Sequence, residues 1–289
     1  MVGQTIRQLS LFLMTVAAFV KVYDGIVLAT DSATTIRLGD GSSQVYNNAD
    51  KIFNLHRDLP IAAMTWGRGQ IGAASISTLS KELRLRLMGM EPEYPNWKLD
   101  PVEYRIEDVA RLTAEFLHER VKECDNGTPQ GTVGMLVSGY SAQAKQGEAW
   151  GFYIQDAETE PTLTQMATED SSGWQTFAQP GATDRLFNGY DSNLAQALKA
   201  AVPEEHHEAV AEALASQIRQ PVIASMPFPD AIALAKFLVE VTSGYSHFLL
   251  GPDTVGGPVE VAGLNRHEGF KWISRKHYYS PDLNQGAQR

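Results

Sequence analysis

The stretch from residue 14 to residue 51 constrains the fold most strongly, because its pattern predicts three consecutive strands. Alternate residues from Val16 to Val22 are small and apolar, so they share one face of the first strand. Residues 26–29 form a short continuous apolar run, as expected for a strand that is buried on both faces. This part of the chain is therefore expected to contribute strands to the core.

Two turn signals predict how these strands pair. Asp24-Gly25 is a hairpin signal, because both central positions of such a turn need a positive φ. With this pair at the turn, Asp31 lies opposite Ala18, about three residues or ~10 Å from Thr15. The Asp31 carboxylate is therefore expected near the start of the first strand.

The second turn is expected at residues 39–41, and it places Lys51 opposite Thr30 and beside Asp31. An aspartate that directly follows a buried apolar run normally needs a partner. The sequence therefore predicts an Asp31–Lys51 pair close to Thr15. The simpler alternative is a chance surface pair at the ends of two strands.

Four motifs between residues 14 and 87 resemble the proteasome β-subunit type of N-terminal nucleophile hydrolase and its ring-forming bacterial relatives. In order, they are Thr-Val-Ala, Asp-Gly-Ile-Val-Leu-Ala-Thr-Asp-Ser-Ala-Thr-Thr, Asp-Lys-Ile and Met-Thr-Trp-Gly-Arg-Gly. The resemblance implies that Thr15 is the nucleophile, with Asp31 as the buried aspartate and Lys51 as the lysine. It also implies that the backbone N–H of Gly67 helps to form the oxyanion hole.

The resemblance is incomplete near the end of the chain. Active family members carry an Asp-x-x-Ser-Gly-Gly stretch, and here Asp253 matches its aspartate. Gly256 stands where the family has serine, or Val255 does if the glycines are aligned, and Thr254 is a possible substitute. Another family serine comes from a loop that corresponds to residues 180–184. Ala182 and Thr183 are the candidates there, although Thr183 and Asp184 also read as a helix N-cap.

The proposed chemistry depends on a free amine at Thr15. A threonine hydroxyl is a weak nucleophile, and the α-amine of an N-terminal threonine can act as its base. That amine ordinarily has a pKa of about 7.7–8.0, which a neighbouring Lys51 ammonium would lower. Gly67 suits an oxyanion hole, because the absence of a side chain lets substrate approach its backbone.

Residues 1–14 are expected to be absent from the active protein. They are either a propeptide removed by self-cleavage or a misassigned start, with translation beginning at Met14. The apolar run from Leu9 to Val20 also has the length of a signal-peptide core, although it continues directly into a strand pattern.

The remaining sequence alternates between groups of strands and groups of helices. Further strands are predicted at 60–65, 132–138, 149–154, 163–168, 174–178, 259–264 and 270–273. Helices are predicted at 69–90, 106–124, 191–201, 204–218 and 227–245. Helices in this order must cover the outer faces of stacked sheets. We therefore expect an α+β fold, a four-layer αββα sandwich, with residues 15–280 as one domain and 281–289 as a tail.

Composition and charge limit the classes of partner that this chain is expected to bind. A net charge of -10 disfavours nucleic-acid binding, and a single cysteine excludes an internal disulfide. We expect a cytoplasmic protein without cofactor or metal and without a membrane or nucleic-acid partner. The resemblance implies a threonine-type endopeptidase that acts on peptides or unfolded protein as a homo-oligomeric ring or spiral. It leaves any ATPase partner unknown. The alternatives are an amidohydrolase of the same fold that cleaves small amides, and an inactive assembly subunit.

Overall fold

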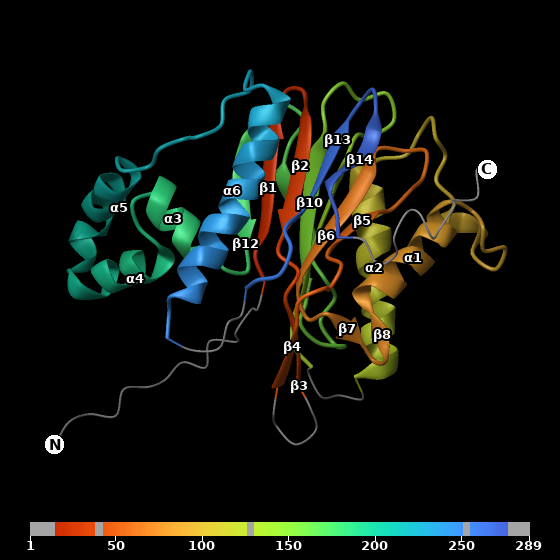
Figure 1. Ribbon diagram of the computed structural model, residues 1–289, viewed down its shortest axis with the longest axis horizontal. Helices are drawn as coiled ribbons and strands as arrows, with labels where there is room; N and C mark the ends of the chain where they lie inside the picture. Colours follow the sequence, from red (N-terminus) through yellow and green to blue (C-terminus); the bar gives the residue numbers. More distant parts are fainter. Residues whose placement is uncertain (1–14, 38–42, 126–129, 251–254, 277–289) are drawn as a thin grey trace.

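The structure is a computed structural model that describes residues 15–37, 43–125, 130–250 and 255–276 (Figure 1). It is a mixed fold of helices and antiparallel sheets, as expected from the sequence. Asp253 and Thr254 lie outside the described residues. None of the described helices combines the length and the apolar character needed to cross a membrane.

Two five-stranded sheets form the centre of the molecule. The first has the order β12 (Gly173–Phe177), β1 (Ala17–Val22), β2 (Gly25–Thr30), β13 (Glu260–Asn265) and β14 (Gly269–Ser274). The second has the order β11 (Thr164–Ala167), β10 (Glu148–Ile154), β9 (Val133–Gly139), β6 (Ile61–Gly67) and β5 (Ile52–Asn54). Two small hairpins complete the strands: β3 (Thr34–Arg37) with β4 (Ser43–Tyr46), and β7 (Gln70–Ile71) with β8 (Ala74–Ser75).

The helices lie on the outer sides of the two sheets (Figure 1). The α-helices of the described residues are α1 (Ile76–Leu87), α2 (Ile106–Cys124), α3 (Gly181–Phe187), α4 (Ser192–Ala201), α5 (His207–Ala215) and α6 (Phe228–His247). Two short 3₁₀ helices are η1 (Pro95–Trp97) and η2 (Glu204–His206). Helix α6 packs against β1, β2 and β13, whereas α1 packs on β5 and α2 on β9 and β10.

Strands β1 and β2 are both buried on two faces, which the sequence predicted for residues 26–29 of β2. Val16, Ala18, Val20 and Val22 belong to the apolar cluster that α6 covers. The opposite face, with Phe19 and Leu28, packs between the two sheets against residues such as Met64 and Leu136. The β1–β2 hairpin therefore contributes to two separate cores at once.

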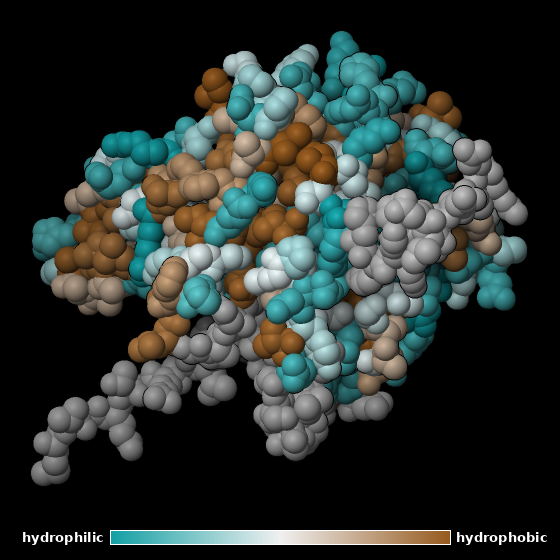
Figure 2. All heavy atoms as spheres, in the orientation of Figure 1, coloured by the Kyte–Doolittle hydropathy of each residue, from teal (hydrophilic) through white to brown (hydrophobic). Residues whose placement is uncertain are grey.

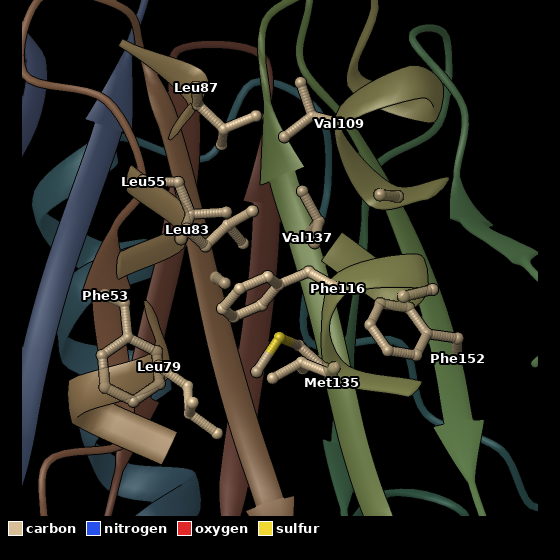
Figure 3. Packing of buried hydrophobic residues seen from close by; sticks show 14 of the residues in the cluster. Phe53, Leu55, Leu79, Leu83, Leu87, Val109, Phe116, Met135, Val137 and Phe152 are labelled. Carbon is tan, nitrogen blue, oxygen red and sulfur yellow. The ribbon is translucent and has the colours of Figure 1, made fainter. Parts of the chain in front are cut away.

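The other helix layer covers the outer face of the second sheet. Figure 3 shows leucines of α1 and Phe116 of α2 packed beside side chains of β9 and β10. The apolar residues of α1 recur at Ile76, Leu79, Leu83 and Leu87, which keeps them on one side of the helix. Burial of this stripe, rather than exposed polar contacts, holds α1 on the sheet.

The predicted register of the first hairpin is wrong by two residues. Val22 pairs with Gly25, so the turn residues are Tyr23 and Asp24 instead of Asp24 and Gly25. Gly25 does not have a positive φ. A Cβ at Gly25 would instead lie 2.6 Å from the carbonyl oxygen of Leu264 and 2.6 Å from the ring of Phe228. Close packing with β13 and α6, rather than turn geometry, requires a glycine here.

The predicted pairing of Lys51 is also wrong. Thr30 pairs with Ala17 on one side and Glu260 on the other, so no place beside it remains for Lys51. Lys51 directly precedes β5, which belongs to the second sheet. The predicted tip of the second turn, at residues 39–41, lies outside the described residues. Residues 181–187 form α3, so Thr183 and Asp184 lie inside a helix rather than at its N-cap.

Candidate active site

Thr15, Asp31 and Lys51 lie together, although they come from both sheets. Thr15 stands just before β1, Asp31 just after β2, and Lys51 just before β5. Lys51 Nζ donates hydrogen bonds to Thr15 Oγ1 at 2.9 Å and to Asp31 Oδ1 at 2.6 Å. The predicted Asp–Lys pair is thus present, and it is an interior pair rather than a surface one.

All three side chains are buried. Thr15 is 2% exposed, Asp31 0% and Lys51 5%. A buried charge is stable only when it is paired and hydrogen-bonded. The Asp31–Lys51 ion pair meets this need, and it directs the lysine ammonium at the threonine hydroxyl.

Backbone N–H groups complete the surroundings of the Asp31 carboxylate. Oδ1 accepts a hydrogen bond from Val16 N at 3.1 Å, and Oδ2 accepts from Ala33 N and Gly256 N, each at 3.1 Å. With Lys51, the carboxylate therefore has four donors. This set fixes Asp31 in one orientation and ties the residue after Thr15 to it.

Lys51 is held by its backbone as well as its side chain. Thr65 N on β6 donates to the carbonyl of Lys51 at 2.9 Å. Burial lowers the pKa of the Lys51 ammonium, while the charge of Asp31 and its hydrogen bond act in the opposite direction. The lysine Nζ is therefore held in a desolvated position between the Asp31 carboxylate and the threonine hydroxyl.

Gly67 is the last residue of β6, two positions beyond the Thr65 amide that binds Lys51. Its φ is +84°, a conformation that favours glycine. The predicted oxyanion residue therefore lies on the strand that supports Lys51. Its left-handed backbone gives a second reason for a glycine at this position.

The segment 255–258 closes over Asp31. Gly256 contributes its N–H to Asp31 Oδ2, and its carbonyl accepts from Ser32 N at 2.9 Å. Val255 is buried in the apolar cluster under α6. Gly257 has a φ of +76°, and a Cβ there would lie 2.6 Å from the Asn47 carbonyl oxygen. Gly256 thus contacts Asp31 through its backbone.

Thr183 forms local hydrogen bonds and does not belong to the Thr15, Asp31 and Lys51 group. Its hydroxyl lies 2.7 Å from the hydroxyl of Thr176 and donates to the carbonyl of Pro180 at 2.8 Å. Ala182 is buried next to it. The hydrogen bonds of Thr183 connect α3 to β12.

A second buried ion pair, which the sequence reasoning missed, adjoins the first. Lys276 Nζ lies 3.0 Å from Glu260 Oε2 and 3.6 Å from Asp50 Oδ1, and it donates to Ser32 Oγ at 2.9 Å. The sequence contained one indication of Glu260, because a carboxylate at the start of an apolar strand is unusual and needs a partner. The sequence contained no indication of Lys276, because this residue reaches the site only through the position of β14.

A cavity of about 370 Å³ lies on the α6 side of the 255–258 segment. Its wall is formed by Glu240, Ser243, His247, Val255, Gly256, Gly257 and Val259. Thr15, Asp31 and Lys51 are not part of that wall. The cavity is therefore separate from the Thr15 hydroxyl.

Among the described residues, no group of three or more His, Cys, Asp or Glu side chains is arranged to hold a metal ion. No protein-family model matches the chain, and no curated protein is similar to it.

Proposed function

We propose that this protein is a threonine-type peptidase that uses Thr15 as an N-terminal nucleophile. The observation that carries the proposal is the buried chain of contacts from Thr15 Oγ1 to Lys51 Nζ and on to Asp31 Oδ1. A lysine in contact with a hydroxyl at the start of a strand, and an aspartate in contact with that lysine, match what an activated threonine needs. A purely structural ion pair would not require the hydroxyl to share the lysine.

The proposed reaction begins with a chain that starts at Thr15. Thr15 Oγ1 attacks the carbonyl carbon of a peptide bond, and its proton passes to the α-amine directly or through one water. The tetrahedral intermediate then collapses, the peptide C–N bond breaks, and the leaving amine takes up the proton. Water hydrolyses the resulting ester and returns Thr15 to its starting state.

The other residues support this nucleophile. The Lys51 ammonium lowers the pKa of the neighbouring α-amine, so that more of the amine is neutral near pH 7. Asp31 keeps Lys51 charged and pointed at Thr15 Oγ1. The Gly67 N–H would donate to the oxyanion, whose stabilisation is worth about 10²–10³ in rate for one donor.

Removal of residues 1–14 is part of the proposal. In the full chain the nitrogen of Thr15 is an amide, which cannot act as a base. A free amine would arise from a precursor that matures by self-cleavage before Thr15, or from a chain whose synthesis begins at Met14 and that loses this methionine.

The layered arrangement supports the family assignment within this proposal. Helices α1 and α2 cover one sheet and α6 covers the other, with an apolar core between the sheets. An αββα sandwich of the N-terminal nucleophile hydrolase type is arranged in this way. In this proposal, residues 15–280 are one domain, and it acts on peptide or unfolded protein within a homo-oligomer.

Intact-mass analysis followed by active-site labelling tests the proposal. The purified protein should have the mass of a chain that begins at Thr15, and an epoxyketone should add once to it. Thr15→Ala should abolish labelling and casein hydrolysis, whereas Thr176→Ala, which alters another buried threonine, should retain both. A stable chain that still begins at Met1 would overturn the proposal.

The choice of substrate separates the peptidase from its alternatives. Cleavage of casein and of short fluorogenic peptides supports an endopeptidase. Labelling at Thr15 together with hydrolysis of small amides alone would point to an amidohydrolase. Correct processing without labelling or hydrolysis would point to an inactive assembly subunit.

A further inference from the structure

Lys276 is a second buried lysine beside the proposed active site. It follows β14, and its side chain is 7% exposed. In addition to its contacts with Glu260, Asp50 and Ser32, Nζ donates to the carbonyl of Ala49 at 2.7 Å. An ammonium with this set of oxygen partners is fixed in position rather than free to rotate.

The partners of Lys276 are sequence neighbours of the catalytic pair. Ser32 follows Asp31, and Asp50 precedes Lys51. Ala49 N also donates to the carbonyl of Ser32 at 2.9 Å, so the two segments already share a backbone hydrogen bond. Lys276 therefore connects the segment that carries Asp31 with the segment that carries Lys51.

Glu260 provides the buried negative charge opposite Lys276. It is 0% exposed and pairs with Thr30, the residue before Asp31. Burial raises the pKa of the Glu260 carboxyl, and the nearby Lys276 charge opposes that increase. Apart from this ion pair, neither Glu260 oxygen has a hydrogen-bond partner among the described residues. Among the described residues, Lys276 is therefore the cation in contact with the Glu260 carboxylate.

The second pair also acts on Lys51 through its charge. Burial is the main cause that lowers the pKa of the Lys51 ammonium; Asp31 and Glu260 raise this pKa, and Lys276 lowers it further. Asp50 and Arg275 are the other charged groups that act on the Glu260 carboxyl. Lys276 thus contributes a positive charge that both Lys51 and the α-amine of a mature Thr15 would experience.

We propose that Lys276 is a positioning residue for the catalytic pair. It holds the Asp31 and Lys51 segments together through Ser32, Ala49 and Asp50, and with Glu260 it adds a second pair of charges beside Lys51. This inference rests on the proposed function. It goes further by assigning a role in the reaction to a residue near the other end of the chain.

Three lysine variants test this role. Lys276→Met removes the charge but keeps an unbranched side chain, Lys276→Arg keeps the charge, and Lys271→Met is a control at an exposed position of β14. The first measurement is the titration of Lys51, followed by NMR in protein labelled with ¹³C at lysine Cε. Lys276→Met should move this titration to higher pH, because a nearby positive charge is lost.

A fourth variant guards against a failure of Lys276→Met to fold. Glu260→Gln leaves Lys276 in place and removes a negative charge, so it should move the Lys51 titration to lower pH. The opposite signs of these two shifts distinguish an electrostatic role from general loosening of the site. Lys276→Arg and Lys271→Met should leave the titration close to that of the wild type.

The second measurement is kcat/KM against pH for the chain that begins at Thr15. Lys276→Met should lower kcat about 10- to 100-fold with little change in KM, because the nucleophile is misplaced. Its acid limb should also move to higher pH, because the α-amine regains a higher pKa. Lys276→Arg should restore most of the rate.

The two measurements separate the possible failures. Absence of hydrolysis by wild-type protein would remove the proposed function, while the Lys51 titration would still report on Lys276. An active enzyme in which folded Lys276→Met and Glu260→Gln leave the Lys51 titration and the acid limb unchanged would overturn the inference. Lower stability without either pH shift would mean that the second ion pair is structural only.

Discussion

At the scale of single residues, the site is a sequence of donors and acceptors that leaves little freedom to Lys51. Its ammonium is shared between a hydroxyl and a carboxylate, and that carboxylate has three backbone N–H donors of its own. The backbone donors matter because they keep Asp31 in place even when the lysine is altered. Substitutions at Lys51 can therefore test charge without removing the aspartate's support.

The stability of Lys51→Met should depend on pH in a defined direction. Because burial lowers the pKa of Lys51, the folded protein releases this proton at a lower pH than the unfolded chain, in which the amine titrates near 10.5. The buried charge therefore costs stability below the folded pKa, and wild-type protein recovers that loss as the pH rises toward 10.5.

The free energy of unfolding of wild type minus that of Lys51→Met should thus increase with pH on the alkaline side. The slope should be at most about 1.4 kcal/mol per pH unit. Urea denaturation at a series of pH values measures it, with the exposed Lys81→Met as a control. A difference that falls as the pH rises would contradict the direction given for Lys51.

At the scale of elements, the β1–β2 hairpin is the part on which the rest of the structure depends. Thr15 precedes its first strand and Asp31 follows its second strand, so both residues lie at the open end of the hairpin. The two faces of the hairpin line two different cores. The first residue of β2, Gly25, is packed tightly against both β13 and α6. A shift of this hairpin would move Thr15 and Asp31 together relative to Lys51 on the other sheet.

Gly25→Ala should destabilise the protein by about 1–3 kcal/mol, the usual effect of overpacking. Its Cβ would lie 2.6 Å from a backbone oxygen and 2.6 Å from the Phe228 ring, and the backbone oxygen cannot easily give way. Gly173→Ala, on β12 of the same sheet, is the control, since a Cβ there meets nothing within 4 Å. Thermal and chemical denaturation compare the two. Equal stabilities would show that β13 and α6 yield at this position.

At the scale of the whole molecule, the two helix layers differ in how many of their residues are buried. Helices α1 and α2 bury apolar residues against the second sheet, but α4 and α5 have no buried residue. Figure 2 shows hydrophobic residues gathered at the end of the molecule where α3, α4 and α5 lie. Leu186 and Leu194 are among the exposed large apolar side chains. Such a surface is typical of a protein–protein contact.

In the proposed homo-oligomer, Leu194 on α4 should therefore lie in a contact between subunits. Leu194→Asp should weaken self-association at least about tenfold, or ~1.4 kcal/mol. Gln196→Asp adds the same charge at another exposed position of α4 and should have a smaller effect. Analytical ultracentrifugation over a range of concentrations measures both. Equal assembly of the two variants would place the contact elsewhere.

The sequence by itself determined most of the elements. Helix α2 occupies the predicted residues 106–124, and the strands lie within a few residues of their predicted positions. It also determined that alternate residues from Val16 to Val22 share one buried face of β1 and that Asp31 pairs with Lys51. These features could be read from the chain because they depend on local periodicity and on the need of a buried carboxylate for a cation.

Only the tertiary structure decided how the site is assembled. Lys51 reaches Asp31 from the opposite sheet rather than from a neighbouring strand, and Gly25 is required by packing rather than by its turn. Gly256 and Lys276 enter the site through contacts between distant segments. Turn signals and periodicity describe neighbours along the chain, whereas these contacts depend on how two sheets stack, which local sequence does not specify.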